Sequence, residues 1–128
     1  MPDSTSHGFG RVLVAVYAVF ALAATARSLV QIATRFDEAP VAYLLSAFAG
    51  IVYIVATIAL GLGRDSTRRL ALVTIVVELV GVLAVGTLSL ADPDLFPDAT
   101  VWSDFGQGYG YVPLVLPFVG LWWLRRTR

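Results

Sequence analysis

The stretch that decides the fold is residues 70–91, which reads LALVTIVVELVGVLAVGTLSLA and contains one charged residue, Glu78. A helix of this length is about 33 Å long, enough to cross a bilayer core of about 30 Å. An isolated carboxylate in hydrocarbon costs several kcal/mol, so Glu78 must be protonated, paired or in contact with water. We therefore predict a membrane-spanning helix that turns Glu78 toward other helices.

The composition of the whole chain places it in the membrane class. Of 128 residues, 58% are hydrophobic and 14% are charged, whereas a soluble domain carries about 25% charged residues. A soluble fold of this length could not bury so much apolar surface. The zero net charge argues against nucleic acid as a partner. The absence of cysteine excludes disulfides, thiol redox chemistry and thiolate metal sites.

Further apolar stretches predict an all-α membrane protein, a bundle of four transmembrane helices in a single domain. We expect helices over residues 12–34, 41–63, 70–91 and 106–124, with an outer loop over residues 92–105. The polar N-terminal tail contains the only histidine, His7. Pro113 and Pro117 should weaken or kink the short last span.

The N-terminal stretch has a second interpretation, as a secretory signal peptide. Arg11, the run VLVAVYAVF and the segment ALAATA resemble the basic, apolar and small-residue regions of such a peptide. Cleavage after Ala26 would leave three spans. The helical pattern continues past Ala26 to Thr34, interrupted only by Arg27, so we favour an uncleaved first span.

The distribution of arginine predicts the orientation. Four spans place both termini and the connection over residues 64–69 on one side of the membrane. That side carries Arg11, Arg64, Arg68, Arg69, Arg125, Arg126 and Arg128, whereas only Arg27 and Arg35 belong to the other side. Because cytoplasmic loops are enriched in Lys and Arg, we expect both termini in the cytoplasm and the acidic loops outside.

Two groups of polar residues inside the predicted spans are candidates for function. Glu78 could lie on a proton or substrate path, or fix helix register through a hydrogen bond to Tyr17, Tyr53 or Thr57. Near the outer end, Arg27 and Gln31 share one face of the first helix and could bind a lipid phosphate. The alternative is a structural role, in which Arg27 snorkels to the membrane surface or pairs with an aspartate of the outer loop, Asp92 or Asp104.

The outer loop mixes acidic and aromatic residues. The segment DPDLFPDATVWSDFGQG holds four aspartates and no basic residue, with Phe96, Trp102 and Phe105 among them. Such a segment is expected to lie on the bilayer surface or to fold back over the helix ends. The spacing of its first aspartates hints at calcium, but the glycine and terminal glutamate of a calcium loop are missing. We predict no metal site.

Small residues at helical spacing line faces of the predicted spans. Examples are Ser46, Gly50 and Gly61 in the second span and Gly81 in the third. Small residues allow close helix packing in lipid. A seam on each of three helices provides more packing surface than four helices need among themselves, which favours association with further helices.

No catalytic constellation can be assembled from the sequence. It lacks paired histidines for haem, a Cys-x-x-Cys motif, a Gly-rich phosphate loop and a Ser/His/Asp set. We therefore predict a protein that is not an enzyme and has no cofactor.

Two resemblances extend this interpretation. The chain is similar to the small multidrug-resistance transporters in having four short spans and one membrane glutamate, although theirs lies on the first helix, which here carries Arg27. The absence of lysine and segments such as ARSLVQIATRFDEAP, VVELVG and SDFGQGYGYVPLVLPFVGLWWLRR resemble the small four-span integral membrane proteins of actinobacteria. That second resemblance implies an inner-membrane protein and no particular activity.

The predicted function is that of a non-enzymatic, multi-pass protein of the cell inner membrane. It would be an accessory subunit of a larger membrane protein or a self-associating bundle, with the lipid bilayer as its surroundings. The alternative is a small proton-coupled transporter or a lipid-binding protein that uses Glu78.

Overall fold

The computed structural model describes residues 8–127, and every regular element in this range is helical. The tail with His7, and Arg128, lie outside the described residues. The long helices are α1 (Phe9–Arg35), α2 (Pro40–Leu62), α3 (Asp65–Ala91) and α4 (Val112–Arg126). Three short 3₁₀ segments connect them, η1 (Phe36–Glu38), η2 (Pro93–Leu95) and η3 (Ser103–Tyr109).

Three helices are long and apolar enough to cross a membrane: α1 together with η1, α2, and α3. The expected all-α class is therefore confirmed for residues 8–127, with three helices that could cross a membrane by their length and composition. The fourth helix, α4, has only 15 residues, which corresponds to about 22 Å. It is shorter than a bilayer core of about 30 Å, so the helix alone does not amount to the fourth span that the sequence predicts.

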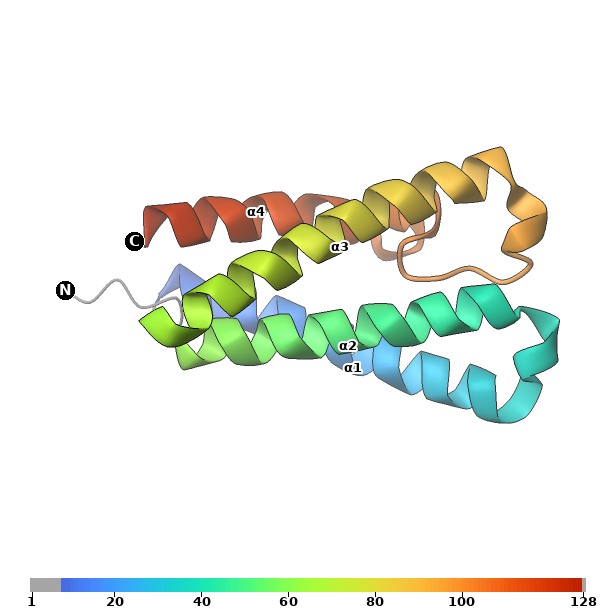
Figure 1. Cartoon of the computed structure of the whole chain (residues 1–128), viewed down its shortest axis with the longest axis horizontal. Helices are drawn as coiled ribbons and strands as arrows, with labels where there is room; N and C mark the ends of the chain where they lie inside the picture. Colours follow the sequence, from blue (N-terminus) through green and yellow to red (C-terminus); the bar gives the residue numbers. More distant parts are fainter. Residues whose placement is uncertain (1–7, 128) are drawn as a thin grey trace.

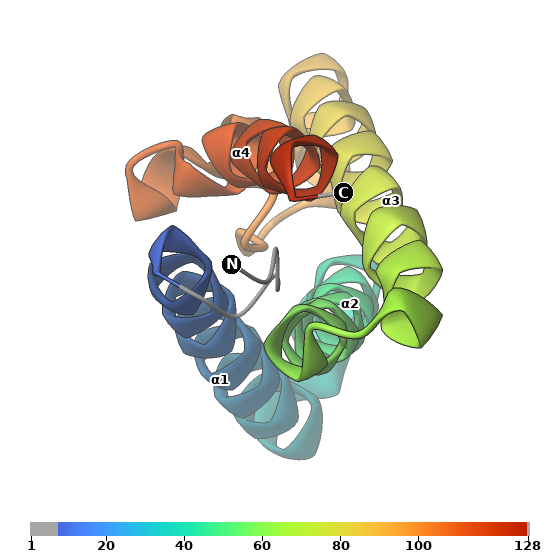
Figure 2. The same cartoon turned by 90° about the vertical axis from the view of Figure 1, so that its left-hand side faces the viewer.

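The four helices run along the long axis of the molecule (Figure 1). Viewed along this axis they follow one another around a ring, with α2 packed against α1 and α3, and α3 against α4 (Figure 2). The start of α1 and the end of α4 lie at the same end of the bundle (Figure 1). We refer to this as the terminal end and to the opposite end as the loop end.

The segment between α3 and α4 differs most from the sequence-based prediction. Residues 106–111, expected to open the last helix, instead form the end of η3 and the turn after it, in which Gly106, Gly110 and Tyr111 have positive φ angles of 84°, 64° and 62°. The helix begins only at Val112, so that Pro113 falls in its first turn, where proline is tolerated. The chain after α3 turns back into the loop end of the bundle before α4 begins (Figure 1).

The connection between α2 and α3 is shorter than expected. Gly63 ends α2 with a positive φ of 61°, and α3 already starts at Asp65. Thr67 lies in its first turn, where its hydroxyl accepts a hydrogen bond from the backbone N–H of Arg64 at 3.3 Å. Most of the arginine-rich connection predicted over residues 64–69 is therefore the first turn of α3.

Candidate functional site

Glu78 is the middle residue of α3, and its side chain is fully buried. The hydroxyl of Tyr17, on α1, donates a hydrogen bond to Oε1 of Glu78. The other oxygen, Oε2, has no hydrogen-bond partner among the described residues. Of the three partners that the sequence offered, Tyr17 is therefore the one in contact, and the bond joins the middle of α3 to α1.

The other two expected partners of Glu78 bond elsewhere. The hydroxyl of Tyr53, on α2, accepts a hydrogen bond of 2.9 Å from Nε1 of Trp102. Thr57 donates its hydroxyl to the backbone carbonyl of Tyr53 at 2.6 Å, as hydroxyls in helices commonly do. The rings of Tyr53 and Tyr17 lie 6.1 Å apart, so Tyr53 still belongs to the same buried cluster.

This polar cluster is enclosed by side chains from three helices and the folded-back loop. Tyr17, Tyr53 and Glu78 are fully buried, and Trp102 is 1% exposed. Glu78 has no exposed surface, and it is absent from the lining of each of four surface grooves between residues 8 and 127. The geometry suits a carboxyl that fixes how α1 and α3 pack, because Glu78 is fully enclosed and bonded to Tyr17.

The aromatic residues of the loop enter the bundle against glycines of α3. The ring of Trp102 lies where a Cβ atom on Gly81 would be, and the ring of Phe105 covers Gly86 in the same way. Gly81, which we expected to serve helix packing, and Gly86 therefore make room for aromatic rings. This role of Trp102 was not predicted, although the sequence contains both the aromatic residues of the loop and the two glycines of α3.

Arg27 and Gln31 lie near the loop end, as expected. Arg27 donates one hydrogen bond to the hydroxyl of Tyr109 at 3.2 Å and another to the backbone carbonyl of Ala99 at 3.0 Å. Neither Asp92 nor Asp104, its expected partners, is bonded to it: Asp104 accepts from Ser89 instead, and Asp92 is exposed. The expected pairing is wrong because the loop turns inward and presents other acceptors.

Arg27 and Gln31 also border a shallow groove of about 410 Å³. Gln31 is 3% exposed, and its carbonyl oxygen has no partner among the described residues. Arg35 and Asp98 line the same groove and approach each other to 3.9 Å. The structure therefore brings the two candidate residues together, beside an ion pair that the sequence did not predict.

The aspartates of the loop do not converge. Asp98 accepts a hydrogen bond of 2.8 Å from the hydroxyl of Tyr43 and so ties the loop to the start of α2. Asp104 bonds Ser89 on α3. Within residues 8–127 no three His, Cys, Asp or Glu side chains form a group that could hold a metal ion.

A lateral groove runs between α2 and α3 in the part of the bundle that the loop fills. Its volume is about 410 Å³, and it is lined by Leu45, Phe48, Val76, Val77, Val80, Gly81, Ala84, Val85, Leu88 and Trp102. Apart from Gly81, which has no side chain, every residue that lines the groove has an apolar or aromatic side chain. The groove would face lipid in a membrane, and Trp102 forms part of its wall.

Comparison of the chain with protein families, with curated proteins and with solved structures finds no match in any of the three.

Proposed function

We propose that this protein is a non-enzymatic, multi-pass membrane protein that functions by binding another membrane-spanning chain through the groove between α2 and α3. The groove is the single observation that carries the proposal. The first occupant to consider is a second copy of this chain, and the alternative is a larger membrane protein of which this chain is an accessory subunit.

The shape of the groove, more than its apolar character, supports this proposal. Lipid tails are as apolar as leucine side chains, so helices associate in membranes through close packing at small residues. The groove is lined by the small, exposed residue Ala84, whereas the ring of Trp102 fills the space beside Gly81. Phe48, which is 46% exposed, lies at the edge of the groove against the ring of Trp102. A helix that enters would gain packing that fluid lipid chains provide less well.

The proposal includes four membrane crossings with both termini in the cytoplasm. The fourth crossing would consist of α4 and the folded segment before it, and the excess of arginine at the terminal end supports the orientation. Because the chain has no cysteine, single-cysteine variants test this cleanly. On intact cells, a membrane-impermeant maleimide should label Gln107→Cys and spare Ser66→Cys; the reverse pattern would contradict the orientation.

Substitution of Ala84 tests whether the groove is an interface. Ala84 is exposed within it, so Ala84→Phe fills the groove without entering the core. Native mass spectrometry in mild detergent should find wild-type dimers and monomeric Ala84→Phe. Ala15→Phe, at an exposed position of α1, is the matched control and should remain dimeric. A monomeric wild-type protein would exclude self-association, and co-purification from its native membrane would then test the subunit alternative.

A second candidate function is a small proton-coupled carrier or lipid-binding protein that uses Glu78. The observation in its favour is the buried Oε2 atom of Glu78, which has no partner among residues 8–127. Purified protein in vesicles with an internal pH-sensitive dye would be tested for proton flux. A flux that Glu78→Gln abolishes would support the carrier, and identical traces for the variant, the wild type and empty vesicles would contradict it.

A further inference from the structure

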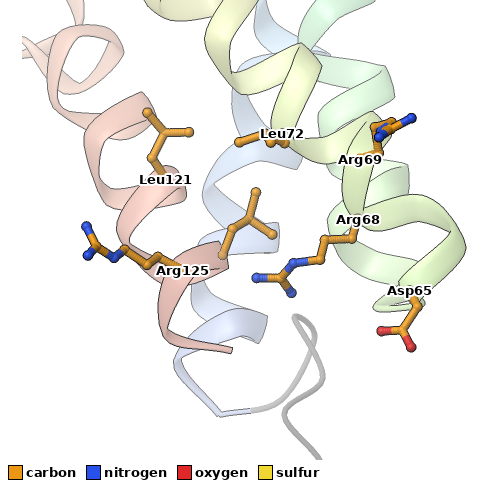
Figure 3. A pocket seen from close by; sticks show the side chains of 7 residues that line it. Asp65, Arg68, Arg69, Leu72, Leu121 and Arg125 are labelled. Atoms are coloured by element: carbon orange, nitrogen blue, oxygen red, sulfur yellow. The ribbon is translucent and has the colours of Figure 1, made fainter. Parts of the chain in front are cut away.

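A second groove opens at the terminal end of the bundle, between the start of α3 and the end of α4. Its volume is about 790 Å³. It is lined by Asp65, Arg68, Arg69, Leu72, Leu121, Leu124 and Arg125 (Figure 3). The proposed association groove lies between α2 and α3 and shares no lining residue with this one, so the two are separate sites.

The charge of this groove is unbalanced. Three arginines and one aspartate line it. None of the three arginines forms an ion pair with another residue in the described range, where the only such pair joins Arg35 to Asp98. Arg68 extends from α3 toward α4, whereas Arg69 and Arg125 lie at the two edges of the groove with their guanidinium groups directed away from it (Figure 3). An anion that enters would therefore meet a cationic side chain that has no ion-pair partner among residues 8–127.

Two of the three leucines that line the groove lie on the side toward the middle of the bundle. Leu72 follows Arg68 by one turn of α3, and Leu121 precedes Arg125 by one turn of α4. In a membrane the leucines would face the hydrocarbon and the arginines the headgroups. This order of charge and apolar surface matches a lipid, which has a phosphate at one end and acyl chains at the other.

We propose that this groove binds one anionic phospholipid. Its phosphate lies against Arg68, with Arg69 and Arg125 at the flanks, and one acyl chain follows Leu72 and Leu121. Basic pockets between membrane helices commonly hold anionic headgroups. Asp65 can accept a hydrogen bond from a headgroup hydroxyl, so phosphatidylglycerol is the best probe. The proposal requires only a membrane-embedded bundle and does not depend on association through the other groove.

The test measures lipid binding to the full chain by native mass spectrometry in mild detergent. The probes are phosphatidylglycerol, phosphatidylcholine with the same acyl chains, and inorganic phosphate. The wild type should bind phosphatidylglycerol in preference to both. The Arg68→Gln/Arg125→Gln variant should bind it roughly 25-fold more weakly, about fivefold for each cationic side chain removed.

Matched variants separate the groove from the overall charge. Arg11→Gln/Arg126→Gln removes two exposed arginines of the terminal end that do not line the groove, so it should bind almost as the wild type does. Arg68→Lys/Arg125→Lys keeps the charge and should retain most of the binding, which also shows that altered side chains at these positions are compatible with folding.

Three results would overturn the proposal. The first is equal binding of phosphatidylglycerol and phosphatidylcholine by the wild type. The second is equal loss in the two glutamine variants, which would indicate a diffuse charge effect. The third is binding of inorganic phosphate as tight as that of the lipid, which would indicate an anion site without a role for the leucines. None of these results bears on whether the protein forms dimers.

Discussion

The two ends of the bundle are completed by different kinds of structure. At the terminal end, α4 packs against α3 as a regular helix, and at the loop end an irregular segment enters the bundle (Figure 1). Irregular backbone is tolerated at membrane depth only where protein surrounds it and satisfies its polar groups. Here hydroxyls do so: Ser103 accepts the N–H of Thr100 at 2.8 Å, and Ser89 accepts that of Asp104 at 2.8 Å. The polar groups of the loop are thus satisfied inside the bundle by side chains of the loop itself and of α3.

Because the inserted segment fills the loop end, removal of its buried tryptophan, Trp102, should have the largest effect on the free energy of unfolding. We expect Trp102→Ala to lower the free energy of unfolding by about 3–5 kcal/mol, the usual cost of removing a buried aromatic ring. Trp122→Ala is the control, because Trp122 is 50% exposed on α4, and should cost roughly 1 kcal/mol. Denaturation in detergent would measure both. Equal losses would mean that Trp102 is not part of the core.

Glycine substitutions provide a finer test of whether the inserted loop packs more tightly on its helix than the helices pack on one another. A methyl group on Gly86 would overlap the ring of Phe105, whereas one on Gly61 has only a methyl of Val14 nearby, at 3.7 Å. Gly86→Ala should therefore destabilise the protein by about 1–3 kcal/mol through overpacking. Gly61→Ala should be neutral or stabilising by up to about 1 kcal/mol, because alanine favours helix. The same unfolding assay measures both variants. An unchanged free energy of unfolding for Gly86→Ala would indicate that the loop does not pack on α3.

Between the two ends, the bond from Tyr17 to Glu78 joins α1 to α3. Tyr17→Phe should lower stability by about 1 kcal/mol, since hydrogen bonds between membrane helices are individually modest. Glu78→Gln should cost less, because the amide oxygen can still accept from Tyr17. A double-mutant cycle with Tyr17→Phe and Glu78→Leu should give a coupling energy near the value of the single bond. Additive losses would show that the two side chains do not interact.

The smallest effect is expected for the ion pair at the outer edge of the loop. Asp98 and Arg35 are both partly exposed, and their charged atoms are 3.9 Å apart. Asp98→Asn should cost about 1 kcal/mol or less, and the loss should shrink as salt is added. Asp94→Asn, at an exposed position of the same loop, is the neutral control. A loss independent of salt would assign the effect to the hydrogen bond from Tyr43 instead.

The long helices could be predicted from the sequence, whereas the path of the inserted loop could not. Periodicity and length predict α1, α2 and α3 within a few residues, since long apolar runs leave the chain no other way to satisfy its backbone in lipid. The contact between Tyr17 and Glu78 was among the expected ones, because a buried carboxyl needs a nearby donor. The partners of Arg27 could not be predicted, because they depend on the path of the loop. That path depends in turn on the fit of Trp102 and Phe105 over Gly81 and Gly86 on α3.

Single-cysteine cross-linking in the native membrane tests the proposed function most directly. Ala84→Cys places a thiol in the groove between α2 and α3, and Leu29→Cys places one at a similar distance from the loop end on an exposed face of α1. Under mild oxidation, Ala84→Cys should form a disulfide-linked dimer and Leu29→Cys should not. Cross-linking of Leu29→Cys alone, or of neither variant, would contradict self-association through this groove.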